Sequence, residues 1–153
     1  MKGKRVLAAG KFDILHLGHI AYLEQARELA GEDGELVVVI ALDKTIVRER
    51  GAPPVFPQDQ RRKIVDSLKF VDRALVGIDT NDHTTIVTEI KPDIIALGYD
   101  QYTDVNLLEA HFASTGLKTE IVRLKKRNAD GLCSSTVIRE RIINYYRENG
   151  TPL

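Results

Sequence analysis

The chain has 153 residues, of which 43% are hydrophobic and 29% are charged, so we expect residues 1–153 to form a single globular domain. Lysine and arginine number 22, as do aspartate and glutamate, so the net charge of zero favours neither nucleic acid nor a membrane surface as partner. A single cysteine, no visible signal peptide and no apolar run near the roughly 20 residues of a membrane span together predict a cytoplasmic protein.

Short apolar runs rich in β-branched residues alternate with helical patterns along the chain. The apolar runs predict strands at residues 5–9, 35–41, 73–76, 93–97 and 120–124. The helical patterns predict helices at residues 20–30, 57–70, 84–90, 105–114 and 134–149. This alternation predicts an α/β fold, a Rossmann-like doubly wound parallel sheet of five strands with helices on both faces. Ligands bind such sheets beyond the carboxyl ends of the strands, where the strand order reverses.

The first strand leads into a glycine turn that carries two histidines. Strand, turn and helix follow one another, which places backbone N–H groups where an anion would bind. His16 and His19 are three residues apart at the start of the helix, so both rings can face one cleft. Imidazole N–H groups suit phosphoryl transfer, and bound phosphates would favour their protonated form. Two histidines without a special role remain an alternative, as does a weak metal-binding pair.

A second anion site is predicted where the last helix begins. Three consecutive hydroxyl side chains lie there, whereas plain helix capping requires only one. They are Ser134, Ser135 and Thr136. The basic run at residues 125–127 lies just upstream and could close over a bound phosphate, or could simply be a solvated face. Residues 51–57, rich in proline and glycine and flanked by arginines, predict a mobile basic flap. Cys133 is expected to be a small buried residue.

The stretch Gly-Lys-Phe-Asp-Ile-Leu-His-Leu-Gly-His at residues 10–19 closely resembles the Gly-Thr-Phe-Asp-x-x-His-x-Gly-His signature of the cytidylyltransferase-like nucleotidyltransferases. Further motifs follow in the family's order. They are Asp43 after the second strand, Gln-Arg-Arg at 60–62, Leu-Gly-Tyr-Asp-Gln at 97–101, and Cys-Ser-Ser-Thr-Val-Ile at 133–138. The resemblance covers residues 4–143 and implies nucleotidyl transfer.

The resemblance also implies a set of site residues. His16 and His19 would be the catalytic groups on the triphosphate. The full nucleotide-binding set would be Gly10, Lys11, Phe12, His16, Gly18, His19, Gly98, Asp100, Arg127, Ser134, Ser135 and Thr136. Weaker candidates for contacts to the acceptor or to phosphate are Asp13, Asp43, Arg48, Arg50, Arg61 and Lys126. Each of these arginines, taken singly, is more typical of a surface charge. Lys11 departs from the family's usual threonine or serine, and its side chain either contacts phosphate or points to solvent.

Members of the family attach AMP or CMP to different phosphorylated acceptors. Gly-Tyr-Asp-Gln at 98–101 and Cys-Ser-Ser at 133–135 resemble the archaeal-type FAD synthases, which implies ATP and FMN as substrates. Those enzymes usually carry two C-terminal cysteines and this chain has one, so glycerol-3-phosphate cytidylyl transfer from CTP remains the alternative. The resemblance further implies direct in-line attack, Mg²⁺ or another divalent cation held by the nucleotide phosphates rather than by a protein metal site, and a homodimer.

Two other functional classes fit the sequence less well. A nucleotide-binding protein without catalysis is a further alternative, although the chain carries both histidines and the hydroxyl cluster. A fragment of a class I aminoacyl-tRNA synthetase would need an anticodon domain and a Lys-Met-Ser-Lys-Ser-like loop, and neither is present. Nucleotidyl transfer is therefore the function that the sequence favours.

Overall fold

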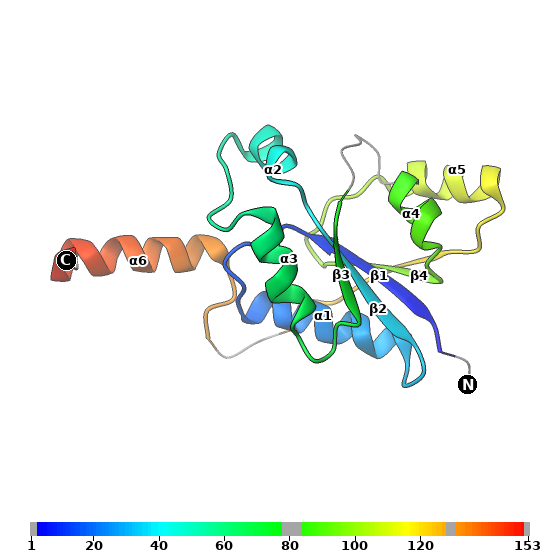
Figure 1. The fold of residues 1–153 in the computed structure, drawn as a ribbon, viewed down its shortest axis with the longest axis horizontal. Helices are drawn as coiled ribbons and strands as arrows, with labels where there is room; N and C mark the ends of the chain where they lie inside the picture. Colours follow the sequence, from blue (N-terminus) through cyan, green and yellow to red (C-terminus); the bar gives the residue numbers. More distant parts are fainter. Residues whose placement is uncertain (1–2, 78–83, 128–130, 152–153) are drawn as a thin grey trace.

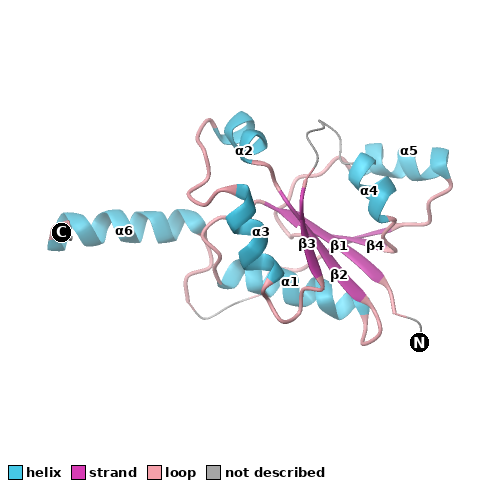
Figure 2. Ribbon diagram, viewed as in Figure 1, coloured by secondary structure: helices cyan, strands magenta, loops and turns pink. Residues whose placement is uncertain are grey.

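The computed structural model describes residues 3–77, 84–127 and 131–151 and forms an α/β fold (Figures 1 and 2). Within these residues, five strands form one parallel sheet in the order β3-β2-β1-β4-β5. The strands are β1 (Arg5–Gly10), β2 (Glu35–Ile40), β3 (Arg73–Val76), β4 (Ile94–Leu97) and β5 (Glu120–Arg123). The helices are α1 (Leu17–Ala30), α2 (Asp43–Arg50), α3 (Gln58–Asp66), α4 (Thr84–Ile90), α5 (Val105–Thr115) and α6 (Ser135–Asn149). The predicted doubly wound sheet is confirmed.

Alternate side chains of the central strands build a separate core on each face of the sheet. On one face, Val6 and Val38 pack in a cluster with Leu23 of α1 and Val65 of α3. On the other face, Leu7 and Val37 belong to a second cluster, which holds residues of α4 and α5. Burial on both faces explains why these strands are continuous apolar runs rather than alternating patterns.

Two predicted helices have different ends in the structure, and one helix was not predicted. Helix α1 begins at Leu17 rather than residue 20, because His16 acts as its N-cap. Helix α2 was not predicted, since its eight residues are mostly charged and only Ile46 is buried. Helix α3 ends at Asp66, whose carboxylate accepts a 2.8 Å hydrogen bond from the backbone N–H of Ala74 at the start of β3. That bond turns the chain back toward the sheet, so the apolar residues after Asp66 do not extend the helix.

β1 and β4 pair only as far as Ala8 and Ala96, and side chains bridge the two strands beyond that point. The hydroxyl of Tyr22 donates to the carbonyl of Ala96 at 2.6 Å and accepts from the N–H of Ala9 at 3.3 Å. Burial raises the pKa of Tyr22 above its usual value, which keeps this hydroxyl protonated. The order of the strands reverses between β1 and β4, so this split is where the fold predicts a ligand site.

Replacing Tyr22 by phenylalanine tests this bridge. Tyr22→Phe keeps the ring but leaves one backbone N–H and one carbonyl without their partner, so the free energy of unfolding is expected to fall by about 1–3 kcal/mol. Urea unfolding followed by circular dichroism measures the change. The control is Tyr145→Phe on the exposed face of α6, which should change stability by less than about 0.5 kcal/mol. Equal effects in the two variants would show that the bridge contributes nothing.

Candidate functional site

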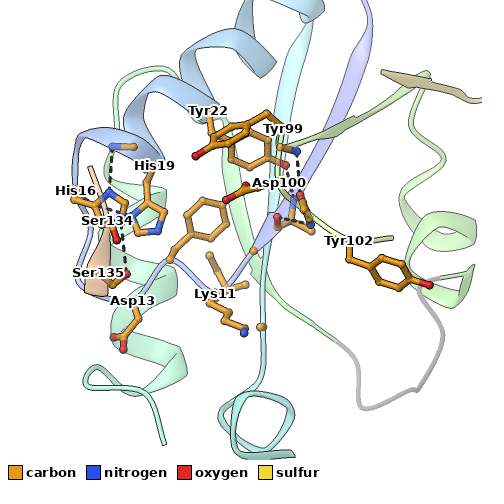
Figure 3. Close-up of a pocket in the computed structure, with 18 of the residues that line it drawn as sticks. Lys11, Asp13, His16, His19, Tyr22, Tyr99, Asp100, Tyr102, Ser134 and Ser135 are labelled. Carbon is orange, nitrogen blue, oxygen red and sulfur yellow. Dashed lines mark hydrogen bonds between the residues drawn. The ribbon is translucent and has the colours of Figure 1, made fainter. Parts of the chain in front are cut away.

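A cavity of about 840 Å³ opens at the carboxyl ends of the strands. It is lined by the turn after β1, the start of α1, the segments that follow β4 and β5, and the start of α6. Figure 3 shows His16, His19, Ser134 and Ser135 gathered on one side of it and Tyr99 and Asp100 on another. Of the expected site residues, the following line the cavity: Gly10, Lys11, Phe12, Asp13, His16, Gly18, His19, Arg50, Gly98, Asp100, Lys126, Arg127, Ser134, Ser135 and Thr136. Asp43, Arg48 and Arg61 do not.

His16 and His19 form a reciprocal cap at the N-terminus of α1. The Nδ1 atom of His16 accepts a 3.1 Å hydrogen bond from the backbone N–H of Gly18. The Nδ1 atom of His19 accepts a 3.2 Å bond from the backbone N–H of His16. This is the capping-box arrangement, with histidines in place of the usual serine or threonine and glutamate. Because each Nδ1 is an acceptor, a neutral ring must carry its proton on Nε2.

The two imidazole rings are stacked, with their centroids 3.7 Å apart and their planes 25° from parallel. Burial lowers the pKa of His16 below its usual value. Burial and the neighbouring His16 lower the pKa of His19 to about 4, although Asp13 acts in the opposite direction. Both rings are therefore neutral near pH 7 in the protein without phosphate, and each offers one Nε2–H donor. That bound phosphate favours their protonated form stays a prediction.

The turn that carries these histidines is strained and is held by two buried polar side chains. Phe12 and Ile14 have φ angles of 53° and 49°, a left-handed conformation that costs a non-glycine residue about 1–3 kcal/mol. The carboxylate of Asp13 accepts hydrogen bonds of 2.7 and 2.9 Å from the N–H groups of Val55 and Phe56. Asp13 is thus a structural clamp, and the segment at 51–57 is tied to the turn rather than being the free flap that we expected.

Arg61 is the second clamp, and the expectation that it is a surface charge is wrong. Its side chain has an exposed fraction of 0%. The guanidinium donates to the carbonyls of Phe56 at 2.9 Å and Lys11 at 2.7 Å, and to the carboxylate of Asp43 at 2.7 Å. Arg61 therefore joins the β1–α1 turn, the 51–57 segment and the start of α2. Neither Arg61 nor Asp43 lines the cavity, so their role is to stabilise the turn that carries the site residues rather than to contact a ligand.

The start of α6 meets the start of α1 across the cavity. A Cβ atom on Gly18 would lie 2.4 Å from the carbonyl oxygen of Cys133, so only glycine fits there. Gly18, which the resemblance places in the nucleotide-binding set, is therefore required by the close approach of this segment of the chain itself. The Oγ atom of Ser135 lies 3.5 Å from Nε2 of His16 (Figure 3).

The side chain of Ser134 makes no capping bond to α6, which leaves the first N–H groups of that helix without a cap. Cys133 is exposed beside this junction rather than buried.

Several of the expected basic contacts are engaged with other protein groups. The ammonium of Lys11 lies 3.4 Å from Glu49, and Arg127 forms a two-bond ion pair with Glu28 of α1 at 2.7 and 3.0 Å. Arg48 donates a 3.5 Å hydrogen bond to the hydroxyl of Thr45 and lies outside the cavity lining. Lys126 places its ammonium 5.7 Å from the ring centre of Tyr99, a distance at which a cation–π contact forms.

The turn after β4 is fixed by Gln101 and Arg123, neither of which was among the expected site residues. The amide of Gln101 accepts from the N–H of Gly98 at 3.1 Å and donates to the carbonyl of Ala9 at 3.2 Å. Gln101 thus spans the split between β1 and β4, as Tyr22 does. Arg123 donates to the carbonyls of Gly98 and Gln101 and holds the turn from outside. Gln101 directly follows Asp100 in the sequence, and this position was the signal that could have marked it as a site residue.

No cluster of three or more histidine, cysteine, aspartate or glutamate side chains that could hold a metal ion occurs among residues 3–77, 84–127 and 131–151. In the same residues, no helix is both long and apolar enough to cross a membrane. The groups that line the cavity at the starts of α1 and α6 include N–H, hydroxyl and cationic donors, which are the kinds of group that bind an anion.

Comparison with known proteins agrees with this geometry. Residues 7–141 match the model of the family described as cytidylyltransferase-like. The FAD synthase of Methanopyrus kandleri is 44% identical over 145 residues, which are 95% of this chain and 95% of that protein. The FAD synthase of Methanothrix thermoacetophila is 47% identical over 139 residues, 91% of this chain and 93% of that protein.

A solved structure is similar over most of the chain. The lipopolysaccharide core biosynthesis protein of Thermoplasma volcanium superposes with a TM-score of 0.74 and 44% identity, covering 82% of this chain and 99% of that one. The family match includes the β1–α1 turn, the turn after β4 and the first part of α6, which together line the cavity. This chain belongs to the cytidylyltransferase-like family, and its similar relatives within that family include FAD synthases.

Proposed function

We propose that this chain is an FMN adenylyltransferase, which transfers AMP from ATP to FMN and releases FAD and pyrophosphate. The observation that carries the reaction type is the meeting of two helix N-termini, those of α1 and α6, on either side of two neutral histidines. The FAD synthase relatives, at 44% and 47% identity over more than nine-tenths of the chain, support FMN as the acceptor. Neither of these two relatives is named for a reaction with glycerol-3-phosphate as acceptor.

In this reaction an oxygen of the FMN phosphate forms a bond to the α-phosphorus of ATP. The bond from that phosphorus to the bridging oxygen of the β-phosphate breaks, and pyrophosphate leaves with the electron pair. A phosphate monoester is already ionised at pH 7, so no protein nucleophile is required. The protein contributes positioning and electrostatic stabilisation, which are the main sources of catalysis in phosphoryl transfer.

The site residues divide this work between the two helix starts. The Nε2–H groups of His16 and His19 would donate to phosphoryl oxygens on which charge develops, and the cap fixes the direction of both rings. The uncapped N–H groups and the hydroxyls at the start of α6 would hold the oxygens on the other side. Lys126, which lines the same cavity, would add a positive charge.

A divalent cation such as Mg²⁺ would enter with ATP as part of the substrate. The described residues provide no cluster of carboxylates or imidazoles that could hold the ion by themselves. The cation would neutralise charge on the triphosphate, while the chain binds the phosphate oxygens that remain.

Aromatic side chains support the assignment of two flat ring systems to the cavity. Tyr99 and Tyr102 both line it, yet they are 52% and 92% exposed. Large aromatic rings left in contact with water at a cavity are typical of binding surfaces. An adenine and an isoalloxazine ring could each stack on such a face.

Since both substrates are cytoplasmic metabolites, we infer that the reaction takes place in the cytoplasm.

The proposal is tested by combining ATP or CTP with FMN or glycerol-3-phosphate and measuring pyrophosphate release. ATP with FMN is expected to give pyrophosphate and FAD in equal amounts, with FAD identified by chromatography. Release from CTP with glycerol-3-phosphate, and none from ATP with FMN, would assign the chain to the cytidylyl branch. Nucleotide binding with no release in any combination would contradict the enzyme assignment.

The role of the histidine donors is tested by variants that keep the cap. The side-chain oxygen of asparagine lies near the position of Nδ1, so His16→Asn retains an acceptor for Gly18 but lacks the Nε2–H donor. We expect kcat to fall by about 10²–10³-fold, the usual cost of one transition-state donor. Stability should change by less than about 1 kcal/mol in urea unfolding, which separates the two roles. An unchanged kcat in both His16→Asn and His19→Asn would remove the histidines from catalysis.

The low pKa of His19 predicts how stability depends on pH. His19 binds a proton near pH 6.5 in the unfolded chain but only near pH 4 in the folded one, so the unfolded state binds more protons between these values. The contribution of His19 to stability is therefore complete above pH 6.5 and is lost as pH falls toward 4, by on the order of 3 kcal/mol.

Urea unfolding at several pH values measures this loss. Carboxylates also titrate in this pH range. The informative quantity is therefore the stability difference between the wild type and His19→Asn at each pH. The stability of the wild type minus that of His19→Asn should become more negative, by up to about 3 kcal/mol, as pH falls from 6.5 to 4, so that His19→Asn becomes the more stable of the two. A difference that does not vary with pH would contradict the lowered pKa.

A further inference from the structure

Gln25 is a polar residue of α1 that lines the cavity and is nevertheless only 8% exposed. Its Nε2 atom donates to the carbonyl of Ala21 at 3.3 Å and to the carbonyl of Lys125, in the segment after β5, at 3.0 Å. Because both partners are acceptors, the side-chain amide has a single orientation, with its NH₂ group toward the two carbonyls. The Oε1 atom of Gln25 therefore points away from them.

The Oε1 atom accepts no hydrogen bond from the residues that the structure describes. Among the same residues, every fully buried side-chain nitrogen or oxygen has a partner. Oε1 is therefore not fully buried, and the surface on which Gln25 remains open is the wall of the cavity. A polar oxygen that is held rigidly at a cavity wall without a donor is a place where an N–H or O–H group of a ligand can bind.

The distance of Gln25 from the histidines matches the length of a nucleoside. Gln25 follows His19 by six residues on α1, which corresponds to about 9 Å along the helix axis. This length is comparable to that from the α-phosphorus of a nucleotide to the far edge of its base. With the phosphates at the start of α1, the edge of the base would reach the level of Gln25.

A second contact places Gln25 at the end of the cavity where an aromatic ring is exposed. Lys125, whose carbonyl Gln25 holds, is followed by Lys126, and the ammonium of Lys126 lies 5.7 Å from the ring centre of Tyr99. Figure 3 shows Tyr99 on a different side of the cavity from His16. A base that stacks on Tyr99 would therefore lie at the end of the cavity remote from the phosphates, beside Gln25.

We propose that Gln25 determines which nucleobase the site accepts, because its Oε1 atom accepts a hydrogen bond from the exocyclic amino group of adenine. The proposal rests on the nucleotide substrate of the proposed function and concerns the base rather than the acceptor. Hypoxanthine and guanine carry a carbonyl oxygen in place of that amino group, so two acceptors would face each other with no proton between them. The site would thus take ATP and reject ITP and GTP. Cytosine also carries an amino group on this edge, so Gln25 does not separate ATP from CTP.

Calorimetric titration of the whole chain with Mg²⁺ and nucleotide, without any acceptor, tests the proposal. The probes are ATP, purine riboside triphosphate, which has hydrogen in place of the amino group, and ITP, which has a carbonyl there. The dissociation constant should rise about tenfold from ATP to purine riboside triphosphate and further for ITP, because a buried acceptor loses its donor. Affinities for ATP and ITP that agree within threefold would overturn the proposal, and this comparison requires no variant.

The variant Gln25→Met separates recognition of the base from packing. Methionine keeps the length of the side chain but offers no carbonyl oxygen, so the dissociation constants for ATP and ITP should come to within threefold of each other. If Gln25 only holds the segment after β5, the variant would weaken both nucleotides equally. A preserved preference for ATP would therefore overturn the proposal.

The matched control is Gln101→Met, which replaces a second glutamine of the same cavity. Both ends of the Gln101 amide are already bonded to the backbone, at Gly98 and Ala9, so its loss should leave the ratio of the ATP and ITP dissociation constants as in the wild type. A ratio that collapses equally in Gln101→Met would assign the discrimination to the shape of the cavity and would overturn the role of Gln25.

The result for the base is distinguishable from the result for the acceptor. Binding of ATP without formation of FAD would refute the proposed function and leave the comparison of ATP with ITP intact. A chain that binds CTP instead of ATP is tested with CTP and UTP, which differ by the same exchange of an amino group for a carbonyl. The same tenfold preference there would support the role of Gln25, and its absence would overturn it.

Discussion

The site depends on one reciprocal pair of hydrogen bonds at the start of α1. Backbone N–H groups at a helix start need acceptors, and here two histidines provide them through their Nδ1 atoms. The same bonds fix the tautomer and the direction of both rings. The two histidines therefore cap the helix through Nδ1 and serve as the donors of the site through Nε2. A serine or aspartate cap would satisfy the helix equally well but would leave no N–H group to donate.

The surrounding elements maintain this geometry at some cost. The left-handed residues Phe12 and Ile14 bring the chain from β1 to the cap, and Asp13 and Arg61 compensate for their strain with five hydrogen bonds. The split between β1 and β4 is likewise filled by Tyr22 and Gln101 rather than by backbone pairing. Polar side chains thus replace regular structure where the fold opens a binding site.

Strand positions and the two-faced core followed from the sequence, because continuous apolar runs have few alternative structures. The motif at residues 10–19 and the hydroxyls at 134–136 likewise indicated the two halves of the site. The burial of Arg61 could not be predicted, since its partners are carbonyls that only the folded turn brings together. Helix α2 was missed because tertiary contacts through Ile46, rather than a periodic pattern, stabilise it. The prediction that Cys133 is buried was wrong, because Cys133 lies at the cavity just before α6, where its side chain is exposed.

The central claim is that His16 and His19 are neutral imidazoles that are protonated on Nε2 and poised to donate to phosphate. Nitrogen-15 correlation spectra of the histidine side chains at pH 7 test this claim directly, with assignment through His16→Asn and His19→Asn. The structure predicts that both rings show the pattern of the neutral Nε2–H tautomer. A charged imidazolium at either position, or a proton on Nδ1, would contradict the account.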